Sequence, residues 1–90
     1  MEKLVLVIDG RDNVAVALRD IAAGTQLELP GGGRLASATD IPFGHKVALE
    51  DIAEDRPVIK YGEEIGRASR SIAGGEWVHT HNMGAIEVEN

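Results

Sequence analysis

An internal repeat constrains the fold of this chain more than any other feature of its sequence. Residues 16–18 (VAL) recur 31 positions later as residues 47–49, and residues 20–22 (DIA) recur at the same offset as residues 51–53. Isolated matches at this offset follow at Gly31 and Gly62, Ile41 and Ile72, Gly44 and Gly75, and Val47 and Val78. The alternative is that β domains reuse turn residues by chance. The clustering of the matches favours two similar β units packed about a pseudo-two-fold axis, because a lone hairpin cannot bury its apolar face.

Short β-branched runs separated by Gly, Asp and Pro predict an all-β chain. Apolar runs of strand length occupy residues 4–8 and 14–18, with a turn cluster at residues 9–13 between them. Three successive glycines at 31–33 predict a loop tip. No segment shows long helical periodicity, and we expect at most one or two helical turns, at residues 16–21. With 90 residues, the chain is predicted to form one domain over residues 1–90.

Composition excludes several classes of function. The formal net charge of −6 disfavours nucleic acid as a partner, because an acidic surface repels phosphate groups. The absence of cysteine excludes disulfides, iron–sulfur clusters, thiolate zinc sites and thiol catalysis. The apolar run near the start is too short for a signal peptide or a membrane span. We therefore expect a cytoplasmic protein that binds neither nucleic acid nor membrane.

Two histidines near the end of the chain are candidate ligands. If residues 78–82 form a strand, the imidazoles of His79 and His81 leave the same face while Thr80 points the other way. Two neutral imidazoles can bind Fe²⁺, Mn²⁺ or Zn²⁺, although a metal site needs further ligands. The alternative is a pair of solvent-facing histidines.

Cationic side chains beside two predicted turns are candidates for binding a carboxylate. His45 and Lys46 follow Gly44, and Lys60 precedes Tyr61 and Gly62. The alternatives are an exposed turn and a solvated edge lysine.

Other polar and aromatic residues have simpler interpretations. Asp9, Asp12 and Asp20 fit turn capping better than acid–base catalysis. The glycine run lacks the Lys-Ser/Thr pair of a phosphate-binding loop, so no nucleotide site is predicted. Trp77 is expected in the core or an interface.

Five blocks of the sequence, taken in order, resemble the N-terminal domain of the altronate and galactarate dehydratases. They lie at residues 12–18, 23–25, 44–52, 59–66 and 77–82, so the resemblance covers nearly the whole chain. The ending with two histidines and Asn82 is more similar to the altronate branch. The resemblance implies an SAF-type β-clip, a compact all-β fold with a pseudo-two-fold internal repeat.

The resemblance also implies a function. The chain would be the small subunit or N-terminal module of a metal-dependent sugar-acid dehydratase, a hydro-lyase of carbohydrate metabolism, and would be inactive by itself. It would assist a larger catalytic subunit or domain in converting an altronate-like acid to a 2-keto-3-deoxy acid. A divalent metal, Fe²⁺ or Mn²⁺, would be held mainly with the large subunit. The implied roles are catalysis and metal binding for His79 and His81, and substrate binding for His45, Lys46, Lys60 and Asn82.

Two other functions remain open at this point. The sulfolactate sulfo-lyases are similar in plan and use a separate small subunit, which would assist loss of sulfite in place of water. A non-catalytic SAF module that binds a carbohydrate or anion is the other alternative. We expect an apolar or Trp-containing surface left open for the larger partner, or for a homodimer.

Overall fold

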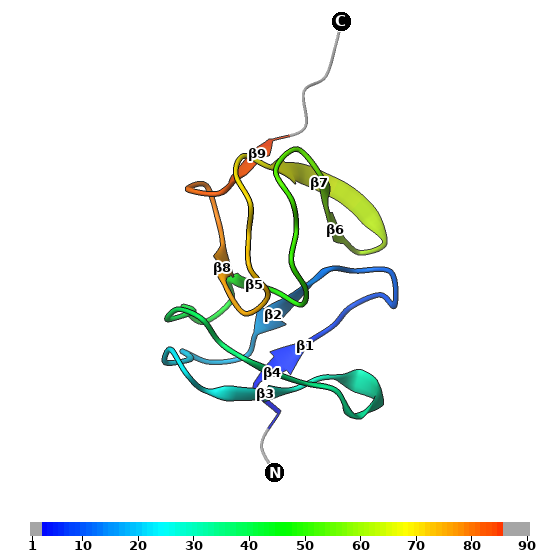
Figure 1. The fold of residues 1–90 in the computed structure, drawn as a ribbon. Coiled ribbons are helices and arrows are strands. Elements are labelled where there is room, and N and C mark those ends of the chain that lie inside the picture. Colours follow the sequence, from blue (N-terminus) through cyan, green and yellow to red (C-terminus); the bar gives the residue numbers. More distant parts are fainter. Residues whose placement is uncertain (1–2, 86–90) are drawn as a thin grey trace, which may run out of the picture.

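The computed structural model describes residues 3–85, which form three small antiparallel sheets (Figure 1). The all-β class is confirmed. The four-stranded sheet, in the order β1-β2-β5-β8, lies between the other two in Figure 1. Its strands are β1 (Val5–Leu6), β2 (Val14–Ala17), β5 (Lys46–Ala48) and β8 (Trp77–Val78). The two-stranded sheet pairs β3 (Gln26–Glu28) with β4 (Arg34–Ala36), and the three-stranded sheet contains β6 (Pro57–Lys60), β7 (Glu63–Ala68) and β9 (Met83–Ala85) in the order β6-β7-β9.

The central sheet contributes to a separate hydrophobic core on each of its faces. Alternation along β2 sends Ala15 and Ala17 into one core, where they join Leu27 and Ile41. It sends Val14 into the other core, where Val58 and Ile72 are buried. The buried residues of both cores are aliphatic, in keeping with a chain in which only 3% of the residues are aromatic.

The 31-residue repeat is present in the backbone conformation. Residues 16–22 and residues 47–53 follow the same course of strand, bend and isolated bridge. Ile21 bridges Ile41, and Ile52 bridges Ile72, with both pairs antiparallel. The helical turn expected at residues 16–21 is wrong, because Val16 and Ala17 are held extended in β2 between β1 and β5.

A turn with the same conformation follows each of the four bridging isoleucines. The third residue after the isoleucine has a positive φ in every case, and these residues are Gly24, Gly44, Asp55 and Gly75. The next backbone N–H then donates to the carbonyl directly after the isoleucine, as from His45 to Pro42 at 3.0 Å. Each half of the molecule therefore contains two such turns, which is one level of repetition more than the sequence predicts.

The helical content of residues 3–85 is limited to one 3₁₀ turn, η1 (Pro30–Gly32), at the tip of the β3–β4 hairpin. This is where the glycine run predicts a loop tip, and Gly31 has a φ of 86° there. No helix in the described part of the chain is long and apolar enough to cross a membrane.

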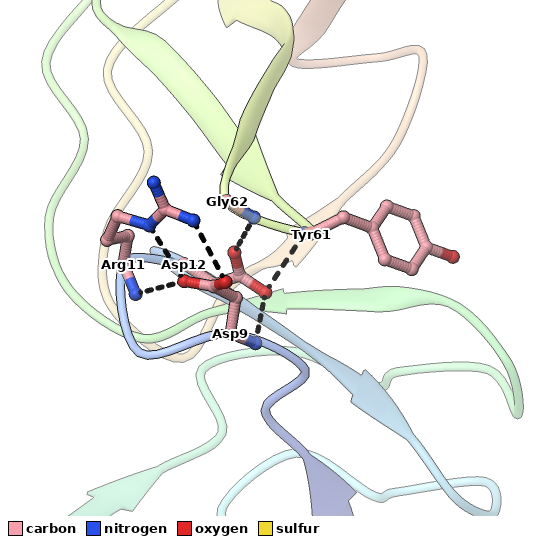
Figure 2. A network of polar contacts seen from close by, with 5 residues as sticks. All are labelled: Asp9, Arg11, Asp12, Tyr61 and Gly62. Atoms are coloured by element: carbon pink, nitrogen blue, oxygen red, sulfur yellow. Dashed lines mark hydrogen bonds and ion pairs between the residues drawn. The ribbon is translucent and has the colours of Figure 1, made fainter.

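A polar network fastens the β6–β7 hairpin to the turn between β1 and β2 (Figure 2). Tyr61 and Gly62 form the two-residue hairpin turn, with φ values of 60° and 71°. The buried Asp12 carboxylate accepts hydrogen bonds from their backbone N–H groups at 3.2 and 2.8 Å, and from Asp9 N–H at 3.1 Å. Arg11 pairs with the Asp9 carboxylate at 3.0 Å. The predicted capping role of Asp9 and Asp12 is confirmed, and the network fixes the end of β6 that carries Lys60.

Candidate functional site

The pairing of β5 with β8 brings together residues that are far apart in the sequence. Because the strands are antiparallel, the start of β5 lies beside the end of β8, with Lys46 opposite Val78. His45 immediately precedes β5 and His79 immediately follows β8. Their imidazole ring centroids are 4.8 Å apart.

Trp77 is the centre of this cluster and contacts all three histidines. His79 stacks on the indole with the ring centroids 5.6 Å apart and the planes 8° from parallel. His81 approaches the indole at 5.0 Å, and His45 meets it edge-on at 5.5 Å. The indole N–H also donates a 3.1 Å hydrogen bond to Nδ1 of His45. Trp77 packs against the core that contains Leu27 and Ile41, as expected, but the sequence did not reveal its contacts with the histidines.

The segment that carries His79 and His81 is a turn, and its prediction as a strand is wrong. β8 ends at Val78, and residues 79–82 form a turn in which Asn82 N–H donates to the His79 carbonyl at 3.1 Å. The two histidines are therefore brought together by this turn, which places both rings against Trp77, and not by strand alternation.

Asn82 explains why the strand stops. Its side chain is fully buried, and its Oδ1 accepts from His79 N–H at 2.9 Å while its Nδ2 donates to the Trp77 carbonyl at 2.8 Å. These bonds satisfy backbone groups that a continuing ladder would otherwise pair. The structure places Asn82 beneath the cluster as a support for Trp77 and His79, and its contact with substrate stays a prediction.

Two lysines add positive charge near the cluster. Half-burial, followed by the charge of Lys60, lowers the pKa of Lys46. The pKa of His79 is lowered by desolvation first, and then by His45, Lys46 and His81. His79 therefore favours its neutral form, which can accept a proton. Of the residues predicted as a site, the structure brings His45, His79 and His81 together around Trp77. Lys46 lies close enough to act on His79, and Lys60 close enough to act on Lys46.

The cluster does not fit a metal ion by itself. Among residues 3–85, no group of three or more His, Cys, Asp or Glu side chains is arranged to hold a metal ion. The ammonium group of Lys46 also acts on His79, and a positive charge there opposes the binding of a cation. The same charges favour an anion such as a carboxylate.

Fold and cluster together define a pseudo-symmetric all-β domain of the β-clip type with a basic, aromatic site at one end of two paired strands. The sequence matches the altronate/galactarate dehydratase SAF domain over residues 3–85, and the chain belongs to this family.

Curated relatives agree with this assignment. The chain is 44% identical over 80 residues to an altronate dehydratase of Bacillus subtilis, a match that covers 89% of this chain and 16% of that protein. An altronate dehydratase of Escherichia coli is 48% identical over 75 residues, covering 83% of this chain and 15% of that protein. The (2R)-sulfolactate sulfo-lyase subunit alpha of Chromohalobacter salexigens is 58% identical over 43 residues, covering 48% of this chain and 46% of that subunit. The chain thus spans about a sixth of the length of the dehydratases that it matches.

Proposed function

We propose that this chain is the small subunit or N-terminal module of a dehydratase that converts an altronate-like sugar acid to a 2-keto-3-deoxy acid. The observation that carries the proposal is the gathering of three histidines around Trp77, with the charge of Lys46 acting on His79 and that of Lys60 acting on Lys46, in a chain with a net charge of −6. A basic site on an acidic domain of this family suits the carboxylate of the substrate.

The chemistry of dehydration explains what such a cluster contributes. Loss of water begins with removal of the weakly acidic proton α to the carboxylate, and negative charge then develops on the carboxylate oxygens. Lys46 and Lys60 would bind the carboxylate and stabilise that charge. His79, whose lowered pKa favours the neutral form, is our candidate for the base. His81, which is exposed beside Trp77, is our candidate for the acid that assists departure of the β-hydroxyl group.

A larger catalytic subunit or domain would complete the site. The small share of the relatives that this chain covers supports a larger part, which we propose to hold any divalent metal of the enzyme. Two exposed aromatic side chains lie in the sequence next to cluster residues. Phe43 is 66% exposed two residues before His45, and Tyr61 is 59% exposed next to Lys60. We propose that the larger part covers them.

A second candidate is the small subunit of a sulfolactate sulfo-lyase. The 58% identity to such a subunit over 43 residues favours it. Its substrate, by its name, is also a carboxylic acid, so the same basic cluster would serve. The two candidates are separated by assaying the complete enzyme on altronate, galactarate and (2R)-sulfolactate.

The carboxylate role is tested by removing one cation at a time in the complete enzyme. We expect Lys46→Met to lower kcat/KM for the sugar acid roughly 10–100-fold, which corresponds to the loss of a charge-assisted hydrogen bond. Arg34→Met is the control, because it removes an exposed cation from β4, outside the cluster. Equal activity of the two variants would refute the role of Lys46.

A further inference from the structure

The hydrogen bond between Trp77 and His45 decides which nitrogen of His45 carries a proton. An indole N–H can only donate, so Nδ1 of His45 must accept the 3.1 Å bond with its lone pair. A neutral imidazole has one N–H, which in His45 is therefore at Nε2.

Both backbone polar groups of Trp77 are hydrogen-bonded to side chains from elsewhere in the fold. Its backbone N–H donates to Thr39 Oγ1 at 3.0 Å, and its carbonyl accepts from the buried Asn82 side chain at 2.8 Å. The stacked ring of His79 covers one face of the indole. These contacts come from two separate segments of the chain, the loop that carries Thr39 and the turn at residues 79–82, so the backbone of Trp77 and one face of its indole are held by the fold and not by His45 alone.

We propose that Trp77 is a positioning residue that fixes the tautomer of His45, so that His45 presents Nε2–H as a hydrogen-bond donor to an oxygen of the sugar-acid substrate. The inference rests on the proposed function and makes it more specific. A nitrogen that carries a proton is neither a metal ligand nor a base. His45 is thereby distinguished from His79, which meets the indole face to face, a geometry without an N–H···N bond between the two rings.

The first experiment needs only this chain labelled with ¹⁵N. We expect a scalar coupling across the hydrogen bond from Trp77 Nε1–H to His45 Nδ1, a pyridine-type shift at Nδ1 and a pyrrole-type shift at Nε2. Because Trp77 is the sole tryptophan, it can be replaced biosynthetically by benzothienylalanine, in which sulfur takes the place of the N–H. The coupling should vanish and both His45 nitrogen shifts should move, while the amide signals of the two cores stay in place. Absence of the coupling in the natural chain, or unchanged His45 shifts in the substituted chain, would overturn the positioning role.

The second experiment tests the donor role in the complete enzyme. His45→Ala should lower kcat/KM for altronate roughly 10-fold, the effect of one lost hydrogen bond to a charged group. His45→Gln, whose amide still donates, should recover most of that loss. Equal losses in the two variants would overturn the donor role, although the tautomer seen by NMR would stand. The proposed function itself is tested separately, by the activity of the Lys46→Met variant.

Discussion

The carboxylate of Asp12 accepts a 2.8 Å hydrogen bond from the backbone N–H of Gly62, fifty residues further along the chain. Asp12 is only 8% exposed, and two more N–H groups depend on it. We predict that Asp12→Ala lowers the free energy of unfolding by roughly 1–3 kcal/mol, because buried donors lose their partner. Chemical denaturation measures this loss.

The control for Asp12 is Asp20→Ala. Asp20 is exposed and accepts a hydrogen bond from Phe43 N–H at 2.8 Å. We expect a smaller loss of about 0.5–1 kcal/mol, similar to that of an exposed cap. If the two variants lose the same stability, the network in Figure 2 is not what fastens the hairpin.

Gly44 and Gly75 occupy the same position in two of the four repeated turns, but their surroundings differ. Their φ values are 80° and 88°. A Cβ at Gly44 would meet no atom within 4 Å, whereas one at Gly75 would collide with the Ala36 carbonyl oxygen. We predict that Gly44→Ala costs about 1 kcal/mol of stability through backbone strain alone. Gly75→Ala should cost roughly 1–3 kcal/mol more, because a backbone oxygen must move.

Thermal melting of the two glycine variants, side by side, measures the difference. Since the strain in φ is common to both, the difference isolates the close approach of the turn at Gly75 to β4. Equal melting temperatures would show that the approach at Gly75 is looser than described.

The titration of His79 should report its surroundings. Because its pKa is lowered from 6.5, the folded chain binds this proton less readily than the unfolded chain. The contribution of His79 to stability is therefore present above pH 6.5 and is lost as the pH falls through the lowered pKa. We predict that NMR finds the His79 pKa below 6.5, and that Lys46→Met raises it by removing a nearby positive charge. A His79 pKa that does not respond to Lys46→Met would contradict the proximity of the two side chains.

The sequence predicts the fold well wherever the signal is periodic or repeated. The V-A-L and D-I-A blocks predict the repeated strand, bend and bridge, because local turn chemistry sets that course. Prediction from the sequence fails at residues 16–21, where pairing of β2 with β1 and β5 overrides a weak helical pattern. Prediction from the sequence fails again at residues 78–82, which were expected to form a strand, because β8 ends at Val78 and the buried side chain of Asn82 closes a turn.

The histidines and lysines could be named as candidates from the sequence, but the arrangement of the histidines around Trp77 could not. His45, Lys46 and Lys60 were identified as candidates beside turns, and the structure brings His45 and Lys46 close to His79. The central role of Trp77 depends on the antiparallel register of β5 with β8, which no local pattern displays. A deduction that residues 46–47 pair with residues 77–78 would have predicted the contact between Trp77 and His45.

The most direct test of the central claim is the pair of variants His79→Ala and His81→Ala in the complete enzyme, with activity, metal content and melting temperature measured together. We predict that each variant loses roughly 10²-fold or more in kcat, as expected for loss of an acid or base. We predict that the melting temperature and the bound metal change little, because residues 3–85 contain no group of three or more His, Cys, Asp or Glu side chains arranged to hold a metal ion. Full activity with both histidines replaced would contradict the claim that this cluster takes part in the reaction.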